Sequence, residues 1–243
     1  MEMTYDHIAR KIDHSLLQPT LTDAQLESGC RLALDYGVAS VCIKPCAVPL
    51  ALRLLKGSAV GVGTTIGFPH GGHSTAIKLA ESRQAIADGA TELDMVVNIG
   101  QVLGGAWDAV GAEIGAITRL AHESGAIVKV IFENCYLDDD QKRRLCRICG
   151  EANADFVKTS TGYGSGGSTR DDLILMRASA PAHVRLKAAG GVRDLDAVIA
   201  CIDLGCERIG LSKTAEILDA LSDRLGRSRV VSRGNPAGAT GGY

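Results

Sequence analysis

Short apolar runs alternate with longer amphipathic segments along almost the whole chain, and this alternation limits the fold more than any other feature. Seven runs predict β-strands, at residues 38–43, 60–67, 92–97, 127–132, 156–158, 184–188 and 208–211. An eighth, shorter strand is expected at 11–17. Strands separated by helices pair in parallel, so eight such units predict an α/β protein with a single (β/α)8 TIM barrel. A doubly wound open sheet fits less well.

The residues between the runs predict where helices end and begin. A residue suited to the left-handed conformation precedes most strands, at Gly37, Gly89, Gly125, Asn153 and Gly205. Capping side chains mark helix starts at 22–23, 74–75, 138–140, 169–172 and 194. No linker divides the chain, so we expect one barrel domain over residues 1–233. Residues 234–243 can bury almost nothing and are expected to form a flexible C-terminal tail.

The composition argues against several classes of protein. Of the 243 residues, 46% are hydrophobic, and the net charge of −2 comes without a block of like charge. This argues against nucleic acid or an anionic membrane as the partner. No apolar run reaches the roughly 18 residues of a spanning helix, and the N-terminus lacks a secretion signal. The eight scattered cysteines favour reduced thiols in a cytoplasmic protein. A homodimer or homotetramer is compatible with the sequence.

Three lysines occur in successive predicted strands, and their positions within the strands differ. Active sites of such barrels lie at the carboxyl ends of the strands, so a polar residue late in a strand faces the site. Lys158 and Lys187 end their strands, whereas Lys129 comes early and should lie deeper. Two neighbouring ammonium groups repel each other and burial adds to the cost, which shifts at least one towards the neutral amine near pH 7. A neutral amine attacks carbonyls, as in a Schiff-base enzyme.

The alternative for each lysine is an ordinary strand-end residue that reaches solvent or a carboxylate. Asp94 stands in an otherwise apolar strand and needs a partner, for which the two late lysines are candidates. It is either an acid/base that transfers protons or a structural aspartate that balances charge. Asp13 presents the same choice with less support.

Two successive glycine-rich turns suit an anion. Gly190 and Gly191 follow one strand, and Ser212 and Lys213 follow the next. The loops after the last two strands of a barrel, together with a helix N-terminus, often hold a phosphate through backbone N–H groups.

Other motifs give weaker signals. His70 and His73 lack a third metal ligand of suitable spacing, so a turn is favoured over a metal site. Cys146 and Cys149 form a C-x-x-C inside a helical pattern without a second pair. Phosphate-loop, dinucleotide and nucleophile-elbow motifs are absent from the sequence.

These residues together resemble the deoxyribose-phosphate aldolase family of class I aldolases. The resemblance covers nearly the whole chain and is most specific in the motifs VCIKP (41–45), GFPHG (67–71), ELDMV (92–96), KVIFE (129–133), KTSTG (158–162) and KAAGGVR (187–193). It implies that Lys158 forms the Schiff base, that Lys187 lowers its pKa and that Asp94 takes part in proton transfer. Cys42 and Glu133 are expected near the pocket without a chemical role.

The resemblance also implies the substrate site and the reaction. The residues expected to bind substrate are Asp13, Thr161, Gly162, Gly190, Gly191, Ser212, Lys213 and Tyr243. Lys213 departs from the family pattern, where a second small residue is usual, and this added cation either strengthens phosphate binding or alters substrate preference. Tyr243 ends the chain, as in members whose terminal tyrosine is thought to enter the site.

The expected substrates are small sugar phosphates and aldehydes: 2-deoxy-D-ribose 5-phosphate is cleaved reversibly to D-glyceraldehyde 3-phosphate and acetaldehyde. Neither a metal nor a cofactor is expected, because the iminium itself polarises the substrate. Two alternatives stay open: an isomerase or lyase that uses Asp94 as a base without a covalent step, and a non-catalytic barrel that acts as a binding module.

Overall fold

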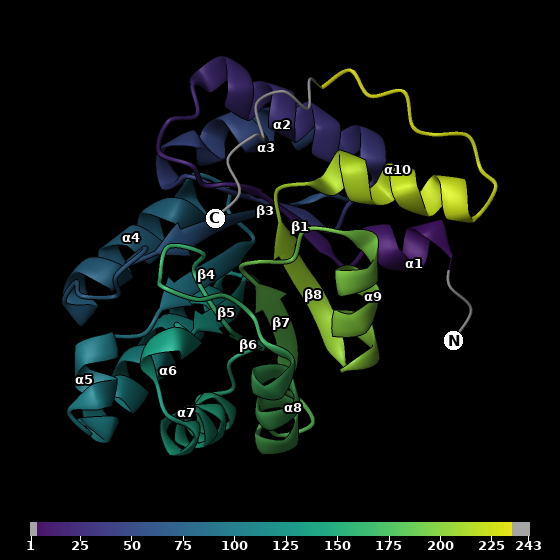
Figure 1. The fold of residues 1–243 in the computed structure, drawn as a ribbon. Helices are drawn as coiled ribbons and strands as arrows, with labels where there is room; N and C mark the ends of the chain where they lie inside the picture. Colours follow the sequence, from purple (N-terminus) through teal and green to yellow (C-terminus); the bar gives the residue numbers. More distant parts are fainter. Residues whose placement is uncertain (1–3, 235–243) are drawn as a thin grey trace.

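The computed structural model describes residues 4–234, and these residues form the predicted barrel. Eight parallel strands close in sequence order, with β8 paired to β1 (Figure 1). The strands are β1 (Ile12–Leu16), β2 (Ser40–Ile43), β3 (Gly61–Ile66), β4 (Glu92–Val96), β5 (Ile127–Ile131), β6 (Phe156–Lys158), β7 (Arg185–Ala189) and β8 (Cys206–Leu211). All eight strands predicted from the sequence are therefore confirmed.

Helices pack around the outside of these strands (Figure 1). They are α1 (Tyr5–Ala9), α2 (Asp23–Tyr36), α3 (Val48–Leu55), α4 (Thr75–Ala87), α5 (Ile99–Leu103), α6 (Trp107–Glu123), α7 (Asp139–Glu151), α8 (Arg170–Ser179), α9 (Leu195–Asp203) and α10 (Thr214–Arg224). Short 3₁₀ turns lie at Pro45–Ala47 and Asn134–Tyr136. Within residues 4–234, no helix combines the length and the apolar character needed to cross a membrane.

The predicted helix boundaries are confirmed in their backbone geometry. All five residues expected to end helices have a positive φ, from 54° at Asn153 to 106° at Gly89. At the starts, Thr22 and Asp138 each form a capping box, with the side chain accepting the N–H group three residues on. These local signals set the lengths of the βα units, and so determine which strand residues reach the two ends of the barrel.

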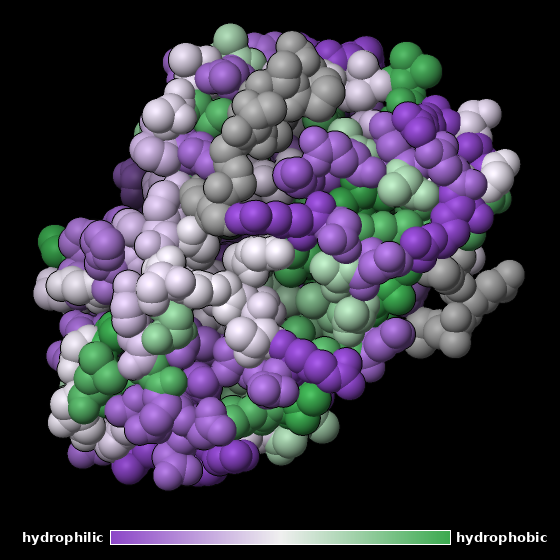
Figure 2. All heavy atoms as spheres, viewed as in Figure 1, coloured by the Kyte–Doolittle hydropathy of each residue, from purple (hydrophilic) through white to green (hydrophobic). Residues whose placement is uncertain are grey.

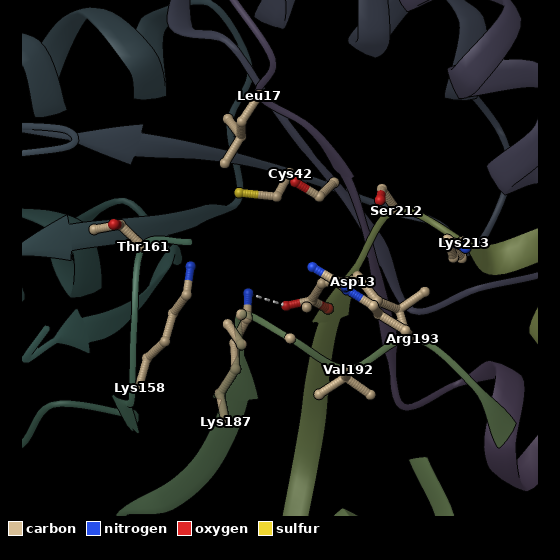
Figure 3. Close-up of a pocket in the computed structure, with 16 residues that line it drawn as sticks. Asp13, Leu17, Cys42, Lys158, Thr161, Lys187, Val192, Arg193, Ser212 and Lys213 are labelled. Carbon is tan, nitrogen blue, oxygen red and sulfur yellow. Dashed lines mark hydrogen bonds and ion pairs between the residues drawn. The ribbon is translucent and has the colours of Figure 1, made fainter. Parts of the chain in front are cut away.

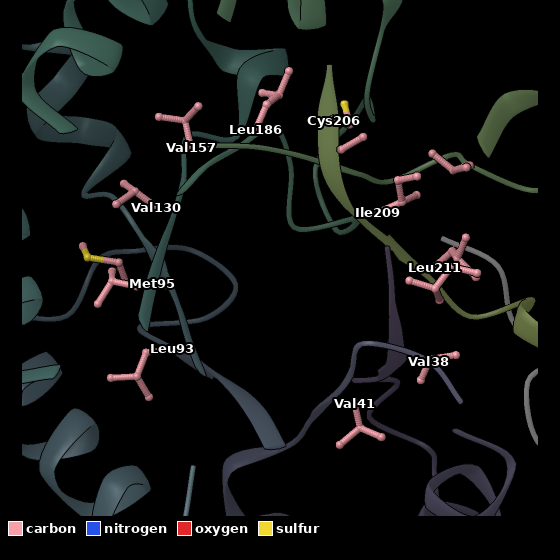
Figure 4. Packing of buried hydrophobic residues seen from close by; sticks show 14 of the residues in the cluster. Val38, Val41, Leu93, Met95, Val130, Val157, Leu186, Cys206, Ile209 and Leu211 are labelled. Carbon is pink, nitrogen blue, oxygen red and sulfur yellow. The ribbon is translucent and has the colours of Figure 1, made fainter. Parts of the chain in front are cut away.

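The apolar core lies between the strands and the surrounding helices. Side chains alternate along each strand, and the outward-facing ones are fully buried aliphatic groups such as Leu93, Val130, Val157 and Ile209. Figure 4 shows them as a ring around the outside of the barrel. Burying each of these side chains contributes about 1.5–3 kcal/mol, so this layer supplies the main driving force for closure.

The inward-facing residues are, by contrast, largely polar. In register across neighbouring strands lie Asp13 and Ser40, Asp94 and Lys129, and Lys158 and Lys187. An irregularity between β7 and β8 brings Arg208 opposite Lys187. The interior of the barrel is therefore filled by ion pairs, for which the aliphatic outer layer provides the surrounding stability.

The surface bears few large apolar side chains. Among residues 4–234, those that are exposed come from separate segments: Leu52, Ile77, Leu103, Tyr136, Tyr163, Ile174 and Val231. In the view of Figure 2, small hydrophobic patches lie among larger hydrophilic areas. The predicted tail, including Tyr243, lies outside the described residues, apart from Gly234, which is buried against α2.

Candidate active site

A pocket opens at the carboxyl ends of the strands, where the sequence predicts the site. Figure 3 shows Leu17, Cys42, Lys158 and Thr161 on one side of it. Arg193, Ser212 and Lys213 gather on the opposite side, next to Val192. The pocket therefore has a lysine end and an end built from the turns after β7 and β8.

Lys158 and Lys187 lie together at the base of this pocket. Both are almost fully buried, at 3% and 1% exposure. Their Nζ atoms lie 2.6 Å and 2.8 Å from the same oxygen, Oδ2 of Asp94. Asp94 itself is completely buried behind them, and its other oxygen accepts a hydrogen bond from Lys129 at 2.7 Å. The sequence-based pairing of the two late lysines with Asp94 is thus confirmed in geometry.

A second carboxylate completes the contacts of Lys187. Asp13 Oδ2 lies 2.5 Å from Lys187 Nζ, an interaction marked in Figure 3. Its other oxygen accepts hydrogen bonds from Ser40 at 2.8 Å and from Arg208. Lys187 is therefore held between two carboxylates, whereas within residues 4–234 the ion pair of Lys158 is with Asp94.

Glu92 and Arg208 close the network from below. Lys129 Nζ lies 2.6 Å from Glu92 and 3.5 Å from Asp13. Arg208 donates to Glu92 at 2.9 Å and also to Asp13. The sequence reasoning correctly placed Lys129 deep in the barrel but did not include Glu92 or Arg208 in the site.

The charges in this network do not balance when every group is ionised. Its basic side chains are those of Lys129, Lys158, Lys187 and Arg208. Its carboxylates are those of Asp13, Glu92 and Asp94. Four cations face three anions, so one positive charge would be buried without a partner. Deprotonation of one lysine removes this unfavourable charge.

The pKa shifts identify which lysine gives up its proton. Burial lowers the pKa of Lys158; Asp94 opposes that shift, and the positive charge of Lys187 reinforces it. Burial also disfavours the charge on Lys187, but Asp13 and Asp94 outweigh it and raise the pKa of Lys187. The pKa of Asp94 is lowered because three lysines outweigh the effect of its burial. Of the two lysines, Lys158 is therefore the one that loses its proton more readily.

The opposite end of the pocket is suited to an anion. Gly190 and Gly191 have φ values of 83° and 81°, which turn the chain after β7 along the pocket wall. Gly190 has no room for a side chain, because a Cβ there would lie 3.0 Å from the backbone of Gly167. Ser212 and Lys213 line this end between β8 and α10, so the N-terminus of α10, with its unpaired N–H groups, begins directly after the pocket lining.

The loop after β6 crosses the mouth of the pocket. Thr161 lines the pocket, and its backbone N–H and hydroxyl both bind the carboxylate of Glu133. Tyr163 then reaches across to donate a hydrogen bond to the carbonyl of Leu17 at 2.9 Å, and its ring packs edge-on against Phe68. The stretch Tyr163–Gly167, which the sequence left undefined, therefore begins as a bridge between β6 and β1.

Most residues that the sequence assigns to the site line the pocket. They are Asp13, Lys158, Thr161, Lys187, Gly190, Gly191, Ser212 and Lys213. Gly162 is not among the lining residues of the described chain, Asp94 lies behind the lysines, and Tyr243 is outside the described residues. Cys42 lines the pocket as expected. Glu133, expected beside it, lies one layer behind, bound to Thr161.

The weaker motifs lie away from this pocket. Cys146 and Cys149 are buried in α7, and burial raises the pKa of both thiols, that of Cys146 to about 12. His70 and His73 are exposed on the loop before α4. Among residues 4–234 no group of three or more His, Cys, Asp or Glu side chains is arranged to hold a metal ion.

A closed parallel barrel with two adjacent buried lysines at its carboxyl-end pocket, one of them with a lowered pKa, is the arrangement of the class of enzymes that act on carbonyls through a lysine amine. Within that class the chain belongs to the DeoC/LacD family of aldolases, whose family model matches residues 7–202.

Named relatives agree with this assignment. The chain is 57% identical to the deoxyribose-phosphate aldolase of Rhodopirellula baltica over 93% of this chain and 94% of that protein. It is 45% identical to the enzyme of the same name from Caldanaerobacter subterraneus over 88% and 93% of the two chains. Among solved structures, a putative deoxyribose-phosphate aldolase from Coccidioides immitis superposes with a TM-score of 0.86 at 35% identity, covering 90% of this chain and 87% of that one.

Proposed function

We propose that this protein is a class I aldolase that reversibly cleaves 2-deoxy-D-ribose 5-phosphate into D-glyceraldehyde 3-phosphate and acetaldehyde. The observation that carries the proposal is the pair of buried lysines at the pocket that share one oxygen of Asp94, with the pKa of Lys158 lowered and that of Lys187 raised. Membership of the aldolase family favours this reaction over an isomerase without a covalent step and over a binding module.

The reaction begins at the Lys158 amine. Its lone pair adds to the C1 carbonyl of the open-chain sugar, and loss of water leaves a protonated imine. When the C3 hydroxyl loses its proton, the C2–C3 bond breaks and its electron pair moves into the iminium. D-glyceraldehyde 3-phosphate leaves, and an enamine stays on Lys158. Protonation of the enamine at C2 and addition of water then release acetaldehyde and restore the amine.

Asp94 and Lys187 are positioned to move the protons. Asp94 contacts both lysines through one oxygen, so a proton can pass along this contact in either direction. The buried charge of Lys187 restores the neutral state of Lys158 after each turnover, because a second ammonium beside it is unfavourable. Asp13 fixes Lys187 in place from the other side.

The remaining pocket residues bind the sugar phosphate. Thr161 lies at the lysine end and contacts a sugar hydroxyl. The phosphate lies at the other end, against the backbone of Gly190 and Gly191, Ser212 and the ammonium of Lys213. This placement requires a substrate that carries its aldehyde and its phosphate on opposite termini.

A direct test is the release of acetaldehyde from 2-deoxy-D-ribose 5-phosphate, followed by its reduction with an alcohol dehydrogenase and NADH. We expect release by the wild type and none by Lys158→Ala. Lys44→Ala serves as the control, because Lys44 binds the carbonyl of Leu21 rather than the network. Consumption of the sugar phosphate without acetaldehyde would instead indicate an isomerase.

We further propose that the protein works as a homodimer or homotetramer. A deoxyribose-phosphate aldolase from Aeropyrum pernix, 31% identical over 91% of this chain and 93% of that one with a TM-score of 0.84, is described as tetrameric. Light scattering coupled to size-exclusion chromatography tests this, and a single peak at the 25.4 kDa of one chain would exclude it.

A further inference from the structure

Glu133 is a buried carboxylate that the mechanism above does not use. It lies two residues after the end of β5 and is 2% exposed. Its φ of 58° is in the left-handed region, which a residue other than glycine rarely adopts, so the surrounding contacts must hold it there. Both carboxylate oxygens are bound to one residue of the pocket wall, Thr161. This combination indicates a built contact rather than an incidental one.

The two hydrogen bonds determine how the Thr161 hydroxyl can act. Glu133 Oε1 accepts the backbone N–H of Thr161 at 3.1 Å, and Oε2 accepts its hydroxyl hydrogen. The hydroxyl oxygen meanwhile accepts the N–H of Tyr163 at 2.9 Å. A threonine hydroxyl has one hydrogen and two lone pairs, so one lone pair is left. Towards the pocket, Thr161 can therefore only accept a hydrogen bond.

We infer that Glu133 is a positioning residue that makes Thr161 a hydrogen-bond acceptor for a hydroxyl group of the substrate. The inference rests on the proposed aldolase function and adds a basis for specificity to it. A hydroxyl on the carbon next to the acceptor aldehyde can donate to Thr161, whereas an ether oxygen at the same place cannot. Glu133 thus selects 2-hydroxyaldehydes through the orientation of a neighbouring side chain.

The loop around Thr161 is shaped to maintain this arrangement. Gly164 passes so close to Glu133 that a Cβ there would lie 3.0 Å from its carboxyl carbon. Beyond it, the bond from Tyr163 to Leu17 fixes the loop across the pocket mouth. Because Thr161 gives Glu133 two donors, the ionised carboxylate is the form that satisfies both hydrogen bonds without change.

Glu133→Gln preserves both contacts with Thr161 but reverses the direction of the hydrogen bond to its hydroxyl group. The amide oxygen takes the backbone N–H of Thr161, so the amide NH₂ faces the hydroxyl oxygen and donates to it. Both lone pairs of Thr161 are then occupied, and its hydrogen turns towards the pocket. Thr161 becomes a donor, which an ether and a hydroxyl can both satisfy.

The experiment compares two acceptor aldehydes, glycolaldehyde and methoxyacetaldehyde, in aldol addition with acetaldehyde. The measured quantity is the ratio of their kcat/KM values. The extra methyl group affects both proteins alike, so the change in this ratio between the wild type and Glu133→Gln isolates hydrogen-bond polarity. One hydrogen bond corresponds to about a fivefold change, so we expect the preference for glycolaldehyde to fall about fivefold. Thr161→Val should also lose the preference for glycolaldehyde over methoxyacetaldehyde.

Asp155→Asn is the matched control. Asp155 precedes β6 and accepts the N–H of Val128 on β5 at 2.9 Å, so it joins the same two strands at the opposite end of the barrel. Its ratio should equal that of the wild type. An unchanged ratio in Glu133→Gln or in Thr161→Val would overturn the inference. A wild type that forms no aldol product at all would instead count against the proposed function.

Discussion

Lys158 and Lys187 are direct neighbours across strands β6 and β7, and both ammonium positions contact the same oxygen of Asp94. One carboxylate oxygen cannot compensate two buried positive charges. Asp13 pairs with Lys187 as well, so the two lysines differ: the pKa of Lys187 is raised and that of Lys158 is lowered. This asymmetry is the basis of the chemistry proposed for the pocket.

Lys187→Met should raise the pKa of Lys158 and slow the enzyme. The substitution removes a neighbouring positive charge and leaves Asp94 Oδ2 to Lys158 alone, and both changes favour the ammonium. The value of kcat/KM rises as Lys158 loses its proton. The acidic limb of the pH profile of kcat/KM should therefore move to higher pH. A shift of about one pH unit would correspond to about a tenfold loss at pH values well below the pKa of Lys158. The pH profile of kcat/KM measures it, and Lys44→Met is the control. An unmoved limb would refute the like-charge argument.

Arg208→Met should raise the pKa of Lys158 through the charge balance of the network rather than through a direct contact. Arg208 contacts Asp13 and Glu92, and its removal reduces the basic groups of the network from four to three. With the charges then balanced, Lys158 can keep its proton, so the acidic limb should again move to higher pH. Arg185→Met, which removes a partly exposed charge that pairs with Asp155 rather than with a carboxylate of the network, should leave the limb in place. Identical profiles for both variants would show that only direct contacts matter.

Asp13→Asn should destabilise the fold in a pH-dependent manner. The lysine and arginine partners of Asp13 lower its pKa from the ordinary 3.8, so its ionised form stabilises the fold at pH values above about 4. That contribution is lost as pH falls below this value. At pH 7 the variant should lose about 3 kcal/mol, because it leaves buried positive charge uncompensated. Urea unfolding from pH 3 to 7 should show the difference narrowing towards acid; a constant difference would contradict the assignment.

Lys213→Ser should weaken recognition of the phosphate and of nothing else. The Lys213 side chain is 39% exposed at the pocket rim, and within residues 4–234 its ion pair is with Glu216 at 3.6 Å. We expect KM for 2-deoxy-D-ribose 5-phosphate to rise about tenfold, the value of one charge-assisted contact, with 2-deoxy-D-ribose unaffected. Lys56→Ser, at the end of α3, is the control. An equal loss for both sugars would place Lys213 outside the phosphate site.

Much of this structure could be predicted because its determinants are local. Positive-φ residues such as Gly89 and Asn153 and capping boxes such as that of Thr22 fix the βα units, and these fix the barrel. Once the strand ends were known, Lys158 and Lys187 were bound to meet at one end. The same reasoning identified Asp94, since a carboxylate in an apolar strand needs buried partners.

The contacts of the remaining site residues could not be predicted from their positions along the strands. Glu92 and Arg208 come early in their strands, away from the carboxyl ends where the pocket lies. Their long side chains nevertheless reach Lys129 and Asp13 in the barrel interior. The contact of Glu133 with Thr161 depends on its left-handed backbone, which is unusual for glutamate. Long-range contacts of this kind can be found only once the strands are placed in register.

The central claim is that Lys158 alone forms the covalent intermediate. The most direct test is to add 2-deoxy-D-ribose 5-phosphate and sodium borohydride, which reduces an imine to a stable amine, and to map the adduct by peptide mass spectrometry. We expect one adduct, on the peptide that contains Lys158. Trapping of the imine should be lost in Lys158→Ala and retained in Lys129→Met. An adduct on Lys187, or turnover of the substrate without any adduct, would contradict this claim.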